Sequence, residues 1–219
     1  HSVEYFVQQI GMQKIKQITY QRKNEYFAHV QLSSFGDDIA LLGQYTKGKA
    51  FRFGELDGHH NYIFHQENDF QASKADKSYE LIAYQICPKV SEKLTNVGLS
   101  GKEVREFLQL DRLLAGFIFG DFVFEPFGYS INAIKGKQFL TIHITPQASS
   151  SYVSIQANIN LIVLAPDFLR ILAPKSIDLL SVNEDAFNQL THQYLPKKYI
   201  SKSLFQRELS NNNLVSFAN

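Results

Sequence analysis

The segment from Gly116 to Ile159 restricts the possible folds more than any other part of the chain. It is rich in Phe, Val and Ile, which favour β-strands, and the turn sequence Lys-Gly-Lys at 135–137 divides it. The long apolar run from Leu113 to Phe124 contains Gly and Asp and is too short to span a membrane. We therefore expect a block of strands in which consecutive strands reverse direction.

The sequence predicts short helices and further strands on both sides of this block. The expected helices cover residues 2–11, 36–47, 89–94, 101–110 and 167–172. The other expected strands cover residues 15–20, 49–56, 61–66, 78–87, 176–183, 203–209 and 213–219. The polar stretch from Gln66 to Asp76 is the best candidate for a linker, so we divide the chain into residues 1–70 and residues 71–219.

The two ends of the chain resemble each other. Residues 4–24 and residues 167–186 each have the pattern of a short helix and then a strand, followed by polar residues. The expected hairpin at 51–64 likewise matches residues 204–217, with Glu-Leu at the same place in both. Because the order of the two units is preserved, we infer a duplicated unit. Roughly eighty residues precede the shared units in the second copy, so the first repeat is expected to lack its opening half.

Charge and cysteine content exclude several classes of protein. The chain has 22 Lys and Arg against 21 Asp and Glu, so no overall charge recruits nucleic acid or a membrane surface. The single cysteine, Cys87, rules out an intrachain disulfide and is typical of a reducing compartment, so we expect a cytoplasmic protein. His59 and His60 are expected on a solvated turn, where adjacent side chains point apart, and we predict no metal site.

The most distinctive motif of the chain lies within the β block. The sequence FEPFGYSINAI begins at Phe124, and LTIHITP at 140–146 and SYVSIQAN at 151–158 follow it. In this order the three segments resemble the pattern of the eukaryotic-type, pyruvoyl-dependent S-adenosylmethionine decarboxylases. The segments ITYQRKN at 18–24 and VSFAN at 215–219 resemble the ends of the same family pattern. The chain is identified as a member of this family, its alpha-chain portion, with the N-terminal segment absent.

This resemblance implies an α+β fold with four layers. In the family, two antiparallel sheets pack face to face with helices outside, in the order α/β/β/α. Each sheet is expected to belong to one copy of the duplicated unit, the first of which is incomplete in this chain. The residues alone predict only strands and short helices.

The chemistry that the resemblance implies depends on a covalent cofactor. These enzymes cut their own chain at a Glu-Ser bond, and the serine becomes a pyruvoyl group that captures the substrate amine and accepts electrons as CO2 leaves. The serine concerned is expected outside this chain. Ser130 and His143 match the serine and histidine that assist self-processing and line the pocket, and Phe124 matches one of two aromatics that hold the adenine. We expect Ser130 and His143 to meet on neighbouring strands, in a cleft that opens toward Phe124.

Some family members are stimulated by putrescine, which binds a buried acidic cluster. Asp76, Ser78 and Glu80 match part of this cluster, and alternate positions on a strand turn side chains to the same side. Gln156 replaces a further acid of the cluster, which reduces the attraction for a dication. Gln147 replaces the glutamate that holds the ribose hydroxyls, and it forms hydrogen bonds without the assistance of a charge.

The function implied by the resemblance is that of a lyase that decarboxylates S-adenosylmethionine in polyamine (spermidine) biosynthesis. Two alternatives stay open. Gln147 and Gln156 favour a catalytically inactive, prozyme-like paralogue that regulates an active partner. Loss of the ribose-binding acid also fits a pyruvoyl decarboxylase for ornithine or arginine, whereas Phe124 favours the adenosyl compound. The expected partners are S-adenosylmethionine, the missing N-terminal (beta) chain segment, and a second subunit in a homodimer or heterodimer.

Overall fold

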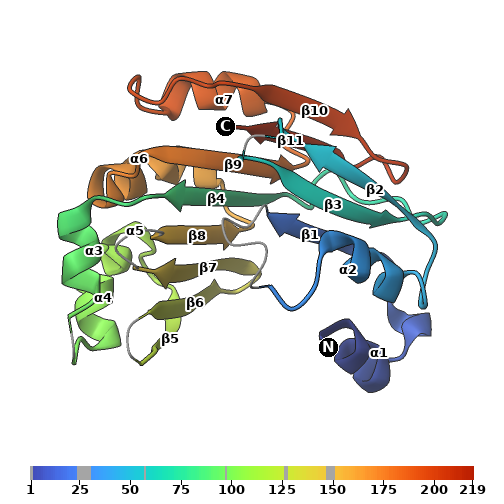
Figure 1. Ribbon diagram of the computed structural model, residues 1–219, viewed down its shortest axis with the longest axis horizontal. Coiled ribbons are helices and arrows are strands. Elements are labelled where there is room, and N and C mark those ends of the chain that lie inside the picture. Colours follow the sequence, from blue (N-terminus) through green and yellow to red (C-terminus); the bar gives the residue numbers. More distant parts are fainter. Residues whose placement is uncertain (1, 24–30, 57, 97, 126–127, 147–150) are drawn as a thin grey trace.

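The strands of the protein form two antiparallel sheets (Figure 1). The computed structural model describes residues 2–23, 31–56, 58–96, 98–125, 128–146 and 151–219. The smaller sheet has the order β1–β3–β2, with bounds Thr19–Lys23 for β1, Gly48–Phe53 for β2 and Asn61–Gln66 for β3. The expected α+β fold with two antiparallel sheets is therefore confirmed.

The larger sheet contains eight strands in the order β10–β11–β9–β4–β8–β7–β6–β5. Their bounds are β4 Ser78–Tyr84, β5 Ile118–Val123, β6 Tyr129–Lys135, β7 Gln138–Thr145, β8 Tyr152–Ala157, β9 Ser176–Val182, β10 Leu204–Glu208 and β11 Leu214–Ala218. The strand block that the sequence predicts corresponds to β5–β8, which lie side by side and alternate in direction.

The helices are short, and several begin with a side-chain cap. They are α1 Ser2–Ile10, the 3-10 helix η1 Met12–Lys14, α2 Phe35–Leu42, α3 Pro88–Leu94, α4 Gly101–Phe107, α5 Leu110–Leu113, α6 Leu161–Leu172 and α7 Phe187–Tyr194. Ser34 and Asp37 form a capping box at the start of α2, and Ser100 and Glu103 form another at the start of α4. Among the described residues, no helix is long and apolar enough to cross a bilayer.

The main core lies between the eight-stranded sheet and its helices. Strand β7 shows why it forms there, because burial alternates along the strand and Leu140, Ile142 and Ile144 all point to the helical side. Phe168 and Leu169 of α6 belong to the same buried cluster. Burial of each such side chain contributes about 1.5–3 kcal/mol to folding. The polar residues of β7 are thereby directed to the opposite face of the sheet.

A second, smaller core joins the two sheets. Phe53 of β2 and Ile63 of β3 pack against Leu180 of β9 and Phe217 of β11. The smaller sheet therefore covers one end of the larger sheet, over β9 and β11. Strand β1 reaches toward the middle, because its residue Gln21 bonds to Glu80 of β4.

The element order repeats along the chain. The first copy runs α1, β1, α2 and the β2–β3 hairpin, and the second runs α6, β9, α7 and the β10–β11 hairpin. The strand order is also the same, since β1–β3–β2 corresponds to β9–β11–β10. This repetition supports the duplicated unit inferred from the sequence.

Several expectations about secondary structure are wrong, and the strand expected at 15–20 is found at Thr19–Lys23 instead. Helix α6 begins at Leu161 rather than 167, because the side chain of Asn160 caps its first turn and the helix tolerates Pro166 near its start. Helix α7 was not expected at all. The strand expected from residue 116 begins only at Ile118, because Gly116 has a φ of 81°, which is not an extended backbone conformation.

The prediction of two solvated histidines is also wrong. His60 is buried, and the Nδ1 atom of His59 lies 2.9 Å from Oδ1 of the buried Asp178. The turn that carries them packs against the larger sheet, so the two rings meet strand residues rather than water. Among the described residues, no group of three His, Cys, Asp or Glu side chains is placed to hold a metal ion.

Candidate active site

Ser130 of β6 and His143 of β7 face each other directly across neighbouring strands. The Oγ atom of Ser130 lies 3.0 Å from Nδ1 of His143, a hydrogen-bonding distance in which the tautomer of the ring decides the donor. The serine is half-buried and the histidine is exposed. The juxtaposition that the sequence predicts is therefore present.

The strand pattern explains why this pair lies on the open face of the sheet. Tyr129 and Ile131, the neighbours of Ser130, are buried on the helical side, as are Ile142 and Ile144 beside His143. Successive side chains alternate between the two faces of a strand. Packing of the apolar neighbours in the main core thus turns the hydroxyl and the imidazole together toward the other face.

Two phenylalanines lie beside the polar pair. Phe122 of β5 is the direct partner of Ser130, and Phe124 follows just after the strand. Their ring centroids are 4.8 Å apart at an interplanar angle of 67°. Phe122 is 62% exposed and Phe124 is 48% exposed, which is unusual for such large apolar side chains. The two rings offer an apolar surface for a flat ring system next to a hydroxyl and an imidazole.

A buried carboxylate lies near the pair. Oε1 of Glu80 accepts hydrogen bonds from Nε2 of Gln156 at 3.1 Å and from Oγ of Ser154 at 3.4 Å, and Oε2 accepts one from Nε2 of Gln21. Ser154 is the direct strand partner of His143. Glu80 is thus connected to the row that contains His143 and Ser130.

The surroundings of Glu80 disfavour its charged form. Burial raises the pKa of this carboxyl above its ordinary value, while the hydrogen bonds from Gln156 and Gln21, the positive charge of Lys23 and the bond from Ser154 act in the opposite direction. Burial prevails because most of these donors are neutral amides and a hydroxyl.

The other predicted residues of this region lie apart from Glu80. Asp76 is exposed in the turn before β4, and Ser78 is exposed at the first position of the strand. Within the described part of the chain, no side-chain hydrogen bond joins either residue to Glu80. Ser78 still shares a strand face with Glu80, whereas Asp76 precedes the strand. Gln147 lies outside the described residues.

Sequence reasoning missed three residues of the site. Phe122 lies two positions before Phe124, and alternation along β5 was the signal that could have identified it. Ser154 lies within the quoted motif and could have been identified from the register of β7 and β8. Gln21 comes from the other sheet, so no local pattern indicates its contact with Glu80.

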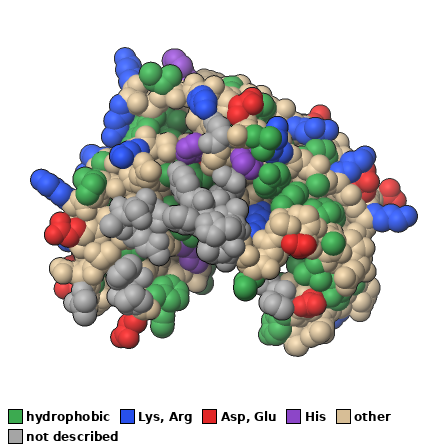
Figure 2. Space-filling model, viewed as in Figure 1, with side chains coloured by type: hydrophobic (Ala, Val, Ile, Leu, Met, Phe, Trp, Pro, Cys, Tyr) green, Lys and Arg blue, Asp and Glu red, His purple; other side chains and the backbone are tan. Residues whose placement is uncertain are grey.

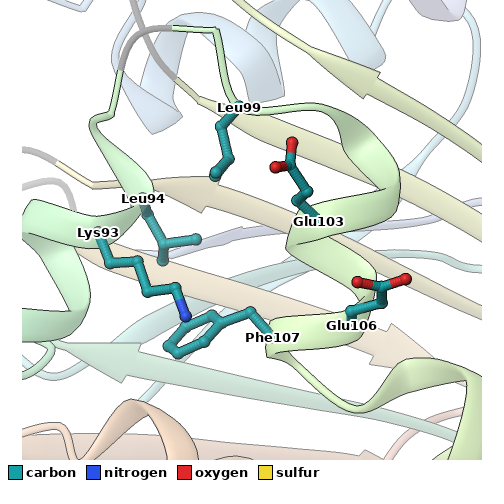
Figure 3. A pocket seen from close by; sticks show the side chains of 6 residues that line it. All are labelled: Lys93, Leu94, Leu99, Glu103, Glu106 and Phe107. Atoms are coloured by element: carbon teal, nitrogen blue, oxygen red, sulfur yellow. The ribbon is translucent and has the colours of Figure 1, made fainter.

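Two hollows among the described residues lie away from the Ser130–His143 pair. One, of about 370 Å³, lies between α3 and α4 and is lined by Lys93, Leu94, Leu99, Glu103, Glu106 and Phe107 (Figure 3). In this hollow the ammonium group of Lys93 approaches the ring of Phe107, and the carboxylate of Glu106 points away from it. Another, of about 510 Å³, lies at the start of α2 near Arg22 and Tyr62. The candidate site is placed on the open face of β5–β7 because the Ser130–His143 pair and the two exposed rings lie together there.

Comparison with known proteins gives a consistent result. The sequence profile of a family described as adenosylmethionine decarboxylase matches residues 2–216. The S-adenosylmethionine decarboxylase proenzyme of Trypanosoma brucei brucei is 30% identical over 156 residues, which cover 66% of this chain and 42% of the relative. The corresponding proenzyme of Caenorhabditis elegans is 28% identical over 207 residues, or 85% of this chain and 56% of the relative. The chain thus spans about half the length of these relatives.

A solved structure supports the fold. The crystal structure of the Trypanosoma brucei AdoMetDC-delta26 monomer matches with a TM-score of 0.68 at 21% sequence identity. The match covers 99% of this chain and 88% of that chain. At 21% sequence identity, this similarity shows a shared arrangement of strands and helices, that is, a shared fold.

Proposed function

Because the chain belongs to the adenosylmethionine decarboxylase family, we propose that it forms part of an enzyme that decarboxylates S-adenosylmethionine with the help of a pyruvoyl group. The main observation that supports this proposal is the Ser130–His143 pair, whose Oγ and Nδ1 atoms lie 3.0 Å apart beside the exposed rings of Phe122 and Phe124. Such a reaction belongs to polyamine biosynthesis and makes the protein a lyase. The proposed compartment is the cytoplasm.

The residues on the open face suit a pyruvoyl group in their donor chemistry. When bound, this group supplies a carbonyl that acts as an electron sink. The hydroxyl of Ser130 can donate a hydrogen bond to an oxygen placed above the sheet. Nδ1 of His143 lies within hydrogen-bonding distance of the Ser130 hydroxyl, so the pair can hold or move a proton beside the reacting group.

The exposed aromatics and Gln147 are assigned to the adenosyl part of the substrate. A flat purine ring is attracted to the faces and edges of Phe122 and Phe124. We assign the ribose hydroxyls to Gln147, whose amide binds them without the charge of a carboxylate. The sulfonium of the substrate is placed near the same rings, because aromatic faces attract cations.

The surroundings of Glu80 are the candidate site for a diamine. Asp76, Ser78 and Gln156 are the other members, and of these Gln156 bonds to Glu80. One carboxylate surrounded by amides neutralises at most one of the two charges of putrescine. We therefore propose that any stimulation by diamines is weak in this protein.

A polypeptide segment outside these 219 residues is the proposed source of the pyruvoyl group. Among the described strands, β1 pairs only with β3, so its other edge is open. β1 lies above β4 and β8, because Gln21 bonds to Glu80 and the ammonium group of Lys23 lies 3.9 Å from the ring centre of Tyr152. Further strands added at this edge would lie above β7, β6 and β5, over the candidate site. The relatives are named proenzymes, which supports a processed chain here too.

The exposed apolar side chains support the same segment. Ile118, Ile134 and Phe139 form a row across β5, β6 and β7 on the open face, and Ile118 is 72% exposed. Figure 2 shows a notch between the part of the molecule formed by β5–β7 and the part formed by α1 and α2, with hydrophobic side chains exposed beside it. A row of this kind is typical of a surface that another layer covers.

A regulatory, catalytically inactive paralogue is the second candidate function. The observation that favours it is the amide environment of Glu80, in which Gln156 and Gln21 stand around a lone acid. A pyruvoyl decarboxylase for ornithine or arginine is less well supported, because the paired rings of Phe122 and Phe124 have no role with those substrates.

Mass spectrometry of the intact gene product tests the proposal. Two chains, one with a pyruvoyl-blocked N-terminus, are expected for the enzyme, and a single uncut chain would support the regulator. Release of CO2 from S-adenosylmethionine, ornithine and arginine then identifies the substrate. The variant T141V is the matched control for H143A, because Thr141 lies on the same strand face two residues away.

A further inference from the structure

The strand that carries the aromatic pair has little support from its own sheet. Among the described strands, β5 is at the edge and pairs only with β6. An edge strand is held by hydrogen bonds along one side, so its ends open more readily than those of a central strand. Phe122 nevertheless must keep its place opposite Ser130 if the two rings are to act with the Ser130–His143 pair.

Helix α4 holds β5 from the opposite face of the sheet. An Nη atom of Arg105 lies 3.0 Å from Oδ2 of Asp121, in an ion pair whose two side chains are only about one-fifth exposed. The guanidinium of Arg105 also lies 5.3 Å from the ring centre of Phe119. One arginine thus contacts two residues of the same edge strand, through an ion pair and a cation–π contact.

Two more residues complete this arrangement. The hydroxyl of Tyr129 donates a hydrogen bond to Oδ2 of Asp121 at 3.4 Å. Burial and the nearby Asp121 raise the pKa of Tyr129, so the hydroxyl keeps its proton. Gly101 lies so close that a Cβ atom there would come within 2.8–2.9 Å of the Asp121 carboxylate. A side chain at position 101 would therefore displace the Asp121 carboxylate from its present place beside Arg105.

Alternation along β5 couples this anchor to the candidate site. Phe119 and Asp121 are half-buried on the helical side, whereas Phe122 is exposed on the open side. Tyr129 is likewise adjacent to Ser130 and points the other way. A shift of Asp121 would move Phe122 and a shift of Tyr129 would move Ser130.

We infer that Arg105 and Asp121 are positioning residues for substrate binding: they fix the edge strand from behind, so that Phe122 and Phe124 stay in place beside Ser130 and His143. The identity of the substrate as S-adenosylmethionine rests on the proposed function. The anchoring of β5 does not, and it is tested separately.

Hydrogen–deuterium exchange of the intact gene product tests the anchoring. In R105Q, which loses both the ion pair and the ring contact, the amides of residues 118–124 are expected to exchange about tenfold faster than in the unmodified protein. In D121N, which loses only the ion pair, they are expected to exchange about threefold faster. The control is D167N, which removes a carboxylate from a more exposed ion pair, Asp167 of α6 with Arg112 of α5 at 2.8 Å, that includes no residue of β5. Unchanged exchange in D121N and R105Q would overturn the inference.

Steady-state kinetics tests the positioning. D121N is expected to raise KM for S-adenosylmethionine about threefold with kcat changed less than twofold, because the loosened rings weaken binding and leave the Ser130–His143 pair intact. D121E should restore KM at least in part, and D167N should not change it. A faster-exchanging β5 with an unchanged KM would overturn the positioning role while leaving the proposed function standing. If the unmodified protein releases no CO2 from S-adenosylmethionine, the proposed function fails, and the exchange measurement still decides whether Arg105 and Asp121 anchor β5.

Discussion

Replacement of Glu80 by Gln should change how the stability of the protein depends on pH. Glu80 is buried, and burial raises its pKa above the ordinary value of 4.5 despite the hydrogen bonds from Gln156 and Gln21 and the charge of Lys23. A raised pKa in the folded state means that the folded protein holds this proton more firmly than the unfolded chain. The stabilising contribution of Glu80 is therefore full below pH 4.5 and is lost as the pH rises through the folded-state pKa.

The magnitude follows from the number of protons involved. One carboxyl changes the free energy of unfolding by at most about 1.4 kcal/mol per pH unit. The unmodified protein should therefore lose stability relative to E80Q by up to that slope as the pH rises above 4.5. The glutamine has no charge to bury, and the side-chain amides of Gln21 and Gln156 can rotate to pair with it.

Glu184 provides a matched control of opposite sign. Burial opposes its ionisation, but hydrogen bonds from Tyr79, Lys77 and the backbone of Ala186 prevail and lower its pKa. The contribution of Glu184 is present above pH 4.5 and is lost as the pH falls through the folded-state pKa. E184Q should therefore be less stable than the unmodified protein at neutral pH, and the difference should shrink in acid.

Urea unfolding between about pH 2 and pH 8 measures both differences, because the Glu80 transition lies above pH 4.5 and the Glu184 transition lies below it. Other titrating groups cancel when each variant is compared with the unmodified protein. The raised pKa of Glu80 is refuted if the difference in unfolding free energy between E80Q and the unmodified protein does not change with pH across this range. It is also refuted if that difference changes with pH in the same direction as the difference for E184Q.

Three further predictions concern the candidate site and the packing. H143A should lower the rate of CO2 release about 10²–10⁴-fold, as expected for loss of a group that transfers protons. T141V on the same strand should keep a rate near that of the unmodified protein. Equal losses in the two variants would contradict the catalytic role of His143. I134K should change the urea midpoint of the 219-residue chain little, because Ile134 is 52% exposed, yet it should reduce the yield of processed, two-chain protein from the intact gene; normal processing would argue against a covering segment. G48A should lower the melting temperature by several degrees, because a Cβ at Gly48 would come within 2.3 Å of the Phe64 ring, and an unchanged melting curve would contradict the packing at this position.

Local sequence patterns were sufficient to predict the structure of segments whose conformation depends on neighbouring residues. The strands β5–β8 and the turn at 135–137 follow from strand-favouring residues and a glycine turn, and the pairing of Ser130 with His143 follows from a motif in which two strands are joined by a short turn. The resemblance of the motif supplied the rest of that expectation. Periodicity alone would not have distinguished Ser130 from other polar strand residues.

Contacts between distant segments could not be predicted in this way. Gln21 and Glu80 are 59 residues apart and belong to different sheets, so their hydrogen bond depends on how the two layers stack. The burial of His60 and the pairing of His59 with Asp178, 119 residues away, arise in the same manner. Helix α6 was predicted too short for a different reason, because its opening residues Leu161–Leu164 include two β-branched side chains and Pro166 follows them.

The separation of the main core from the candidate site has a consequence for protein engineering. The tightly packed interior lies behind the eight-stranded sheet, and the side chains proposed for chemistry project from its front. Changes to residues such as Asn132 or Thr141, which share that front surface, leave the packed interior untouched. A library randomised at these positions should therefore retain folded members of the 219-residue chain at high frequency, and processing of the intact gene product then selects the members whose front surface still accepts the covering segment.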